Sequence, residues 1–267
     1  MAPRNILPNA LKTPVLEKLK KRRIVLASAS PRRKEILRTI GIDPDIVPST
    51  FEEDLSPGSF DDIHEYPVAT ATQKAVEVYE KLVEENPDDA PDLVIAADTV
   101  VLTHVQPVAS NISYSLLPAD RQDLLEKPST KEDNLRMLMD LNGHVCEVVT
   151  GVVVVFPVLQ SPGYKIQSID ERTLVHFADS PQHVLEAYAE HGEGVDRAGG
   201  FAIQVSLAFF SAGVRMRSAE RRVAQGAGSL LIKKIEGDYQ NVVGFPAASF
   251  YKFLELLVEE DEDFLDV

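Results

Sequence analysis

Residues 24–33 read IVLASASPRR, and this stretch decides how the fold is expected to begin. The apolar run Ile24–Ala27 predicts a short buried strand. Pro31 suits the first turn of a helix, because proline has no backbone N–H to leave unbonded and its φ is already close to the helical value. Apolar residues at helical spacing predict a helix over Arg32–Ile40, which ends at Gly41. The sequence therefore predicts a strand that passes directly into a helix.

The junction between this strand and this helix carries polar groups that suit a phosphate. Ser28 and Ser30 supply two hydroxyls, and Arg32 and Arg33 supply two guanidinium groups. A helix N-terminus offers free N–H donors and a partial positive charge, and a guanidinium matches the oxygens of a phosphate. Two interpretations fit this segment alone: a turn that binds a polyphosphate, or an ordinary helix start with solvated arginines.

Strands and helices alternate along the rest of the chain. Asp92–Leu102 is almost entirely apolar, which is typical of a strand buried on both faces of a sheet. Val68–Glu85 has apolar residues at helical spacing. The other predicted elements are strands at Ile46–Pro48, Val145–Val158 and Thr173–Phe177, helices at Lys131–Leu141 and Pro181–His191, a hairpin that pairs Leu230–Ile235 with Asn241–Val243, and a last helix from Pro246 to about Glu259. This order predicts an α/β fold.

The length and composition of the chain set its expected domain organisation. The 267 residues, of which 44% are hydrophobic, are enough for one large core. We expect a single domain over residues 23–260 with two lobes around a cleft, a flexible extension over 1–22 and a loose acidic tail over 261–267. The first residues lack the apolar core of a signal peptide, so a cytoplasmic protein is expected, with a nuclear location as the alternative because Lys18–Arg23 is basic.

The net charge of −15 limits which partners are expected. An acidic protein is repelled by nucleic acids and by anionic membrane surfaces, so neither is expected as a partner. The chain has no apolar stretch of about 18 residues, so no membrane span is expected. The single cysteine, Cys146, excludes an internal disulfide and is expected to be a small buried apolar residue. Because the net charge is negative, an anionic ligand would need a local cationic pocket.

Asp98 is the second residue that suggests chemistry, because it interrupts an apolar run. A carboxylate there has a desolvation cost and is stable only if it is paired, hydrogen-bonded or bound to a metal. Mg²⁺ is commonly held by one or two carboxylates together with phosphates. Glu52 and Glu53, in a loop after an earlier strand, are candidates for the second carboxylate. The alternatives are a structural aspartate and a solvated acidic loop.

Two lysines and one glutamine complete the set of candidate residues. Lys74 lies within a predicted helix and Lys127 in a loop. Each alone is typical of a solvated surface residue, but together with Arg32 and Arg33 they could balance the charge of a triphosphate. Gln204 could recognise the amide-like edge of a base. The chain has no Walker A motif, no Rossmann glycine motif and no nucleophile elbow, so these classes are not supported.

Taken together, these residues resemble the Maf family of nucleoside triphosphate pyrophosphatases, from about Ile24 to the C-terminal helix. The resemblance rests on motifs in the family's order: Leu26–Arg33, Glu53, Gln73–Ala75 around Lys74, Ala97–Thr99, Glu126–Pro128, Asp196–Gly199 followed by Ile203–Gln204, and Asn241–Pro246. It implies an α/β fold of the Maf and inosine triphosphatase type, with a mixed twisted sheet, flanking helices and two lobes around a deep cleft. A homodimer is also implied.

The resemblance further implies a hydrolase that uses Mg²⁺ or Mn²⁺ to convert a nucleoside triphosphate to the monophosphate and pyrophosphate. Arg32, Thr99 and Gln204 resemble the dTTP/UTP branch, which implies dTTP, UTP and modified pyrimidine nucleotides as substrates. The implied cellular role is to keep noncanonical nucleotides out of nucleic acids. The implied roles are metal binding by Asp98 and Glu53, with Asp98 as general base, catalysis by these two with Lys74 and Lys127, and substrate binding by Ser28, Ser30, Arg32, Arg33, Thr99 and Gln204. The alternative is a nucleotide-binding regulatory protein of the septum-inhibition type without turnover.

Three features depart from the family pattern. Arg197 stands where the family usually has lysine, which keeps the charge but changes the shape. Residues 103–122 and 205–225 are insertions. Deletion of 205–225 joins Gln204 to Gly226, which restores the family's form, and Val205 and Gln225 could be translated intron boundaries. The second insertion is thus either a retained intron or a genuine surface loop. A transcript that codes through it would exclude the intron.

Overall fold

The computed structural model describes residues 5–103, 105–107, 114–116, 123–203, 226–260 and 264–265. Gln204 and the insertion at 205–225 lie outside the described residues, as does most of the insertion at 103–122. By its contacts the chain divides into two compact units. Unit 1 comprises 1–98, 150–171 and 244–267, and unit 2 comprises 99–149 and 172–243. The predicted single domain over 23–260 stays a prediction.

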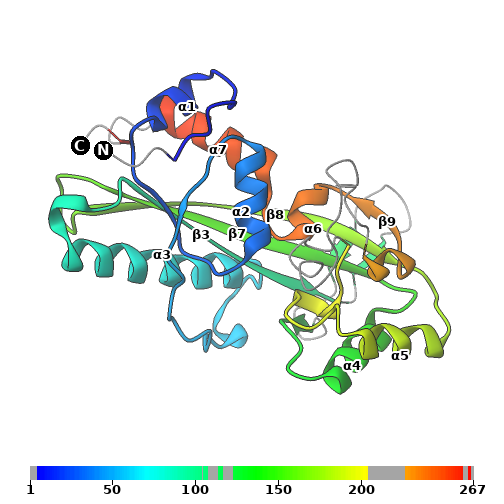
Figure 1. The fold of residues 1–267 in the computed structure, drawn as a ribbon. Coiled ribbons are helices and arrows are strands. Elements are labelled where there is room, and N and C mark those ends of the chain that lie inside the picture. Colours follow the sequence, from blue (N-terminus) through cyan, green and yellow to red (C-terminus); the bar gives the residue numbers. More distant parts are fainter. Residues whose placement is uncertain are drawn as a thin grey trace, which may run out of the picture. The chain divides into compact units, whose positions relative to one another are not determined.

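A mixed sheet organises the fold, as expected for the α/β class (Figure 1). Its strands, in spatial order, are β2 (Asp45–Ile46), β1 (Ile24–Leu26), β3 (Leu93–Leu102), β7 (Val145–Pro157), β8 (Tyr164–Phe177) and β9 (Ile232–Glu236), with β6 (Leu124–Leu125) paired to β3. β1 runs parallel to both β2 and β3, whereas β6 and β9 are antiparallel to their partners. A separate antiparallel pair joins β4 (Val105–Pro107) to β5 (Tyr114–Leu116).

In unit 1, helix α3 (Glu65–Glu85) packs on one face of the sheet. Ala71, Ala75 and Val78 lie three or four residues apart and so share one side of the helix. They form a buried cluster with apolar residues of β1, β3 and β7, including Val94 and Ala96. Alternate strand residues share a face, so the β3 residues that follow Val94 and Ala96 at this spacing are directed toward α3.

The approach of α3 to the sheet explains a glycine in β7. A Cβ atom at Gly151 would come within 2.5 Å of the backbone nitrogen of Val68, near the start of α3. No side chain fits at that distance, so the close packing of helix on strand requires glycine.

Unit 1 also contains the α-helices α1 (Pro14–Leu19), α2 (Pro31–Thr39) and α7 (Ala247–Glu260). α1 packs against α7 and buries Val15, Leu16 and Leu19 (Figure 1). Asn5 donates a hydrogen bond to the carbonyl of Asp43 over 2.8 Å. The first residues therefore contribute a helix to the core of unit 1, where we expected an extension; the flexibility of 1–22 and of 261–267 stays a prediction.

Unit 2 contains α4 (Lys131–Leu141), α5 (Gln182–His191) and a short 3₁₀ helix at Ala198–Gly200. α4 packs against α5, and the amide of Asn134 donates a hydrogen bond to the carbonyl of Gly200 over 2.6 Å. The ring of Phe177 meets the ring of Phe201 edge to face, with centroids 5.0 Å apart.

The predicted hairpin of Leu230–Ile235 with Asn241–Val243 is wrong. β9 pairs with β8 instead, and the second segment is helix α6 (Tyr239–Val243). The carboxylate of Asp238 accepts a hydrogen bond from the backbone N–H of Gln240 over 2.7 Å, which favours a helical turn. Asn241 is then buried and donates to the carbonyl of Val148 and to the hydroxyl of Thr173.

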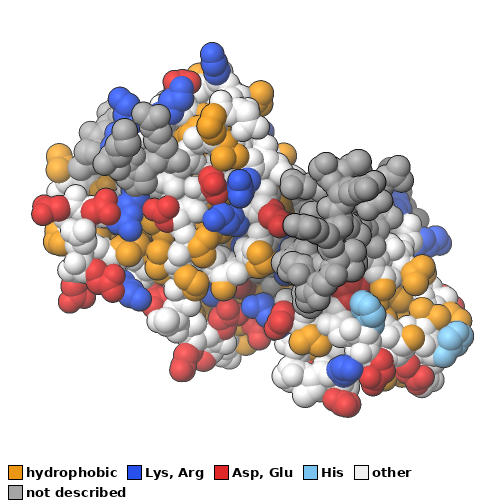
Figure 2. Space-filling view, in the orientation of Figure 1, with side chains coloured by type: hydrophobic (Ala, Val, Ile, Leu, Met, Phe, Trp, Pro, Cys, Tyr) orange, Lys and Arg blue, Asp and Glu red, His pale blue; other side chains and the backbone are white. Residues whose placement is uncertain are grey.

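Other sequence-based expectations concern single residues and the surface. Cys146 is buried, as expected, and burial raises the pKa of its thiol. None of the described helices is long and apolar enough to cross a membrane. On the face drawn in Figure 2, the Lys and Arg side chains lie among Asp and Glu side chains rather than in one broad basic surface.

Candidate active site

Three parallel strands bring the first set of candidate residues to one edge of the sheet. Leu26 of β1 is in register with Ile46 of β2 and with Ile95 of β3. The strands run in the same direction, so the segments that follow these residues leave at the same edge. Ser28 follows β1, and the loop over residues 47–56 follows β2. Asp98 lies within β3, three residues after Ile95.

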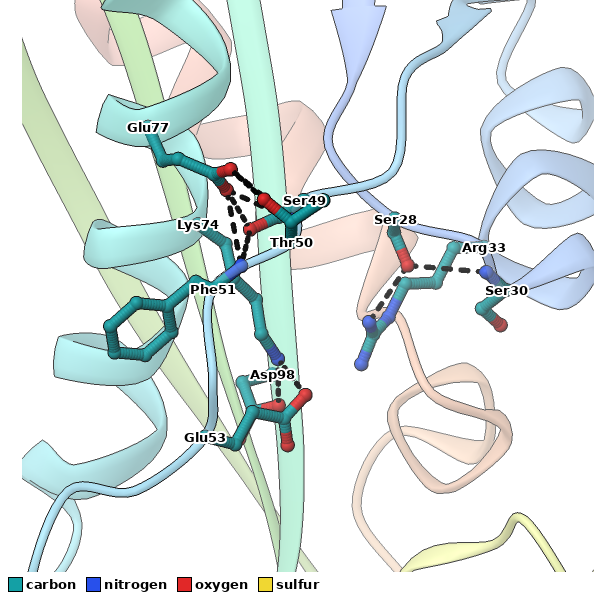
Figure 3. A network of polar contacts seen from close by, with 10 residues as sticks. All are labelled: Ser28, Ser30, Arg33, Ser49, Thr50, Phe51, Glu53, Lys74, Glu77 and Asp98. Atoms are coloured by element: carbon teal, nitrogen blue, oxygen red, sulfur yellow. Dashed lines mark hydrogen bonds and ion pairs between the residues drawn. The ribbon is translucent and has the colours of Figure 1, made fainter.

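Lys74 joins two carboxylates at this edge (Figure 3). Its ammonium lies 2.8 Å from Oδ1 of Asp98 and 2.7 Å from Oε1 of Glu53. The side chains of Lys74 and Asp98 are each 10% exposed, and that of Glu53 is 36% exposed. Two carboxylates on one ammonium leave this cluster with one excess negative charge, which favours a cation beside it. We name Glu53, Lys74 and Asp98 the carboxylate–lysine centre.

Local structure explains why Lys74 and Asp98 meet. Lys74 lies one helical turn from Ala71 and from Val78, next to the stripe of α3 that packs on the sheet. Asp98 follows Ala96 by two residues in β3, so it lies on the strand face that α3 covers. Burial of an unpaired charge is costly, and the ion pair satisfies both groups. The expectation that Asp98 needs a partner is confirmed.

Arg33 lies beside Ser28 at the start of α2. Its Nη1 donates a hydrogen bond to the hydroxyl oxygen of Ser28 over 3.1 Å, and its Nε donates to the carbonyl of Gly244 over 3.0 Å. Burial lowers the pKa of Arg33, whereas the negative charges of Asp98 and Glu53 act to raise it. Two hydrogen bonds therefore fix the guanidinium within electrostatic range of the carboxylate–lysine centre.

The position of Gly244 depends on its backbone conformation. Its φ is +122°, a value that residues with a Cβ rarely adopt. This conformation directs the carbonyl that accepts the bond from Arg33. Gly244 belongs to the motif Asn241–Pro246, one of the motifs on which the resemblance to the Maf family rests, although that resemblance implied no role for this residue.

Arg32 and Ser30 present unengaged polar groups at the same helix start. Arg32 is half-buried, and within the described ranges it makes no hydrogen bond or ion pair. Ser30 is the N-cap residue of α2, but its hydroxyl makes no capping bond; its backbone N–H donates to the hydroxyl oxygen of Ser28 over 3.3 Å. Both side chains have the chemistry expected of phosphate-binding groups.

The remaining candidates are not part of unit 1. Thr99 is half-buried in β3 and Lys127 is exposed in the loop after β6; both belong to unit 2 and are described only within it. The Lys127 loop is tied to the 3₁₀ helix of that unit, because the N–H of Gly199 donates to the carbonyl of Glu126 over 3.0 Å. Gln204 is outside the described residues, so its role stays a prediction.

Sequence reasoning did not identify Glu77, which binds the loop that carries Glu53 (Figure 3). Its carboxylate accepts hydrogen bonds from the hydroxyls of Ser49 and Thr50 and from the backbone N–H groups of Thr50 and Phe51. Burial alone would raise the pKa of Glu77, but these hydrogen bonds outweigh it and lower the pKa. The only signal in the sequence is its position one turn after Lys74.

The carboxylate–lysine centre fits a hard divalent cation. Asp98 and Glu53 supply carboxylate oxygens, the ligands that Mg²⁺ and Mn²⁺ prefer. The described part of the chain has no group of three or more His, Cys, Asp or Glu side chains that could hold a metal. Two carboxylates suit Mg²⁺, because this ion usually keeps several waters and takes further ligands from substrate phosphates. Of the two candidate glutamates, Glu53 contacts Lys74.

Comparison with known proteins places these residues in a family. A family model described as Maf-like protein matches residues 23–219. A dTTP/UTP pyrophosphatase of Schizosaccharomyces pombe is 34% identical over 258 residues, which is 94% of this chain and 90% of that protein. A dTTP/UTP pyrophosphatase of Saccharomyces cerevisiae is 34% identical over 244 residues, or 86% of this chain and 88% of that protein.

A longer human relative, a probable bifunctional dTTP/UTP pyrophosphatase/methyltransferase protein, is 36% identical over 243 residues. The match covers 90% of this chain but 33% of the human protein. The strand-to-helix junction at Ser28–Arg33 and the carboxylate–lysine centre both lie within the segment that the family model matches. The chain belongs to the Maf family.

Proposed function

We propose that this protein hydrolyses dTTP, UTP and modified pyrimidine nucleotides to the nucleoside monophosphate and pyrophosphate. By acting on the modified forms it would keep noncanonical nucleotides out of nucleic acids. The observation that carries the proposal is the carboxylate–lysine centre at the sheet edge that also presents Ser28 and Arg33. Membership of the Maf family and the names of the relatives support the choice of reaction and of substrates.

Asp98 and Glu53 would hold a divalent metal ion. When bound, Mg²⁺ or Mn²⁺ polarises a phosphate oxygen and lowers the pKa of water. Lys74 keeps both carboxylates in place before such an ion binds.

Residues of the chain then act on the triphosphate and on water. In the proposed reaction, Asp98 accepts a proton from the water whose oxygen attacks the α-phosphorus. The bond from the α-phosphorus to the oxygen that bridges to the β-phosphate breaks, and pyrophosphate leaves with the electron pair. Arg32, Arg33 and the hydroxyls of Ser28 and Ser30 bind phosphate oxygens, so their charge and hydrogen bonds stabilise the leaving group.

Three residues of the proposal depend on the family resemblance. Lys127 is proposed to bind the phosphates, and Thr99 and Gln204 to contribute to recognition of the pyrimidine nucleotide. A homodimer is proposed on the same basis, and light scattering of the purified chain tests the oligomeric state. The cytoplasmic location stays a prediction.

A panel of nucleoside triphosphates with Mg²⁺ or Mn²⁺ tests the proposed function. Pyrophosphate release is measured in water enriched in ¹⁸O, with Asp98→Asn as the inactive control. We expect the fastest release from dTTP or UTP, with the label in the monophosphate. Preference for purine triphosphates would show that the substrate is wrong, and release of orthophosphate would show that the cleaved bond is wrong. Binding without turnover would favour a regulatory protein.

A further inference from the structure

Glu77 of α3 accepts several hydrogen bonds from the loop that carries Glu53. Residues 49–53 form neither helix nor strand. The backbone N–H groups of Thr50 and Phe51 both donate to the carboxylate of Glu77, at 3.1 and 3.3 Å from Oε2. The hydroxyl of Thr50 adds a bond of 2.5 Å to Oε1, and the hydroxyl of Ser49 adds another. One carboxylate therefore fixes three consecutive residues.

Both anchors of this loop come from the same helix. Lys74 and Glu77 are three residues apart on α3, so they lie on one face with a rise of about 4.5 Å between them. Glu77 binds the loop at Ser49–Phe51, and Lys74 binds it at Glu53. Two extended residues span at most about 7 Å, so fixing Phe51 leaves Glu53 little freedom in where its carboxylate can go.

Glu77 itself is not suited to bind a metal or a substrate. Its two oxygens already accept the bonds from Ser49, Thr50 and Phe51. Its effect on chemistry would have to pass through the loop that it binds.

We propose that Glu77 is a positioning residue that fixes the segment Ser49–Phe51 to α3 and thereby holds the carboxylate of Glu53 on Lys74, beside Asp98. This inference rests on the proposed function for its effect on turnover, but the geometry that it describes does not. Hydrogen bonds that hold a reactive group in place are worth most when the group lies on a loop, because the loop has no ladder of its own to fix it.

The test compares Glu77→Ala and Glu77→Gln with the matched control Glu84→Ala. Glu84 is an exposed glutamate two turns further along α3. Hydrogen exchange of the peptide that covers residues 49–53, measured on the full chain, should become faster in both Glu77 variants and stay unchanged in the control. Mn²⁺ titration should show about tenfold weaker binding in the Glu77 variants. These two readouts decide the role of Glu77 even if no nucleotide is hydrolysed.

Turnover of dTTP then shows whether Glu77 acts through Glu53. We expect kcat to fall about 10- to 100-fold in Glu77→Ala, because small misplacements of a reactive group have effects of this size. Adding Glu77→Ala to Glu53→Gln should cause less than a twofold further loss. Multiplicative losses would overturn the proposal, as would unchanged exchange at residues 49–53.

Variants on the loop side of the contact guard against a folding defect in the helix. Ser49→Ala combined with Thr50→Val removes the two hydroxyl donors and leaves α3 intact. This double variant should also accelerate exchange at 49–53 and weaken Mn²⁺ binding, by a smaller factor than Glu77→Ala. Wild-type exchange and Mn²⁺ binding in this variant would contradict the proposal.

Discussion

Strand β3 and the loop at residues 47–56 both deliver a carboxylate to Lys74, but they hold it in different ways. Asp98 sits in a strand whose position is fixed by backbone pairing to β1 and by a buried core against α3. Glu53 sits in a loop without regular structure and is more than three times as exposed as Asp98. Its position depends on side-chain contacts with Lys74 and, through the loop backbone, with Glu77. A site can thus combine a rigid ligand with one whose order depends on a few hydrogen bonds.

Replacement of Asp98, the carboxylate on the strand, should have the largest effect on activity. Asp98→Asn removes the proposed proton acceptor and one metal ligand but keeps the shape of the side chain. We expect pyrophosphate release from dTTP to fall about 1000-fold, with the melting temperature little changed. The same change in the loop, Glu53→Gln, should cost less activity, and a larger loss at Glu53 than at Asp98 would reverse the assigned roles.

Removal of the ammonium group of Lys74 should affect stability more than any other single change at the centre. Lys74→Met leaves Asp98 buried without its partner, next to a second carboxylate. The free energy of unfolding, measured with urea at pH 7, should fall by about 3–5 kcal/mol. The double variant Lys74→Met with Asp98→Asn should recover part of this loss. If the double variant is no more stable than the single one, the loss of stability in Lys74→Met does not come from the unpaired buried carboxylate of Asp98.

Gly244→Ala tests the support of Arg33, which comes from a third segment, the start of α2. At a φ of +122°, alanine is strained although no atom lies close enough to block its Cβ. We expect a loss of stability of about 1–3 kcal/mol and a higher KM for dTTP, because the carbonyl that holds Arg33 shifts. Thermal unfolding and steady-state kinetics check the two effects. An unchanged KM would show that this contact does not position Arg33 for substrate.

The smallest expected effect is a pH dependence that arises from Glu77. Its pKa is lowered in the folded protein from the ordinary value of 4.5. The unfolded chain therefore binds the proton more readily, and the stabilisation is present above about pH 4.5 and lost as the pH falls through the folded pKa. Glu77→Gln should be less stable than the wild type by about 1 kcal/mol at pH 7, with a smaller difference near pH 3. A difference that grows on acidification would contradict the sign of this shift.

Much of the fold could be predicted, because the spacing of apolar residues along the sequence indicates which side of a helix or strand is buried. The boundaries of α4 were predicted as observed, and those of α2, α3 and β3 to within a few residues. The segment around α6 was mistaken for a strand, because its apolar residues are too few to show a period. Its helix depends on contacts of Asp238 and Asn241 that have no signature in the sequence.

The candidate site was predictable where a residue type conflicts with its surroundings. Asp98 stands out because a carboxylate in an apolar strand needs a partner. Lys74 and Glu53 do not stand out individually, because a helix lysine and a loop glutamate are ordinary surface residues. The sequence alone made them candidates only as members of a set, and the family resemblance selected Glu53 over Glu52. Glu77 was missed, because two of its partners are backbone N–H groups of a loop whose path the sequence does not reveal.

Mn²⁺ binding to the full chain tests most directly whether the strand carboxylate and the loop carboxylate form one centre. Paramagnetic resonance can follow free Mn²⁺ in titrations of the wild type, Asp98→Asn and Glu53→Gln, each with a non-hydrolysable dTTP analogue present. We predict that each substitution weakens Mn²⁺ binding at least about tenfold. Wild-type affinity in either variant would show that the two carboxylates do not share a metal, and would contradict the account of the site.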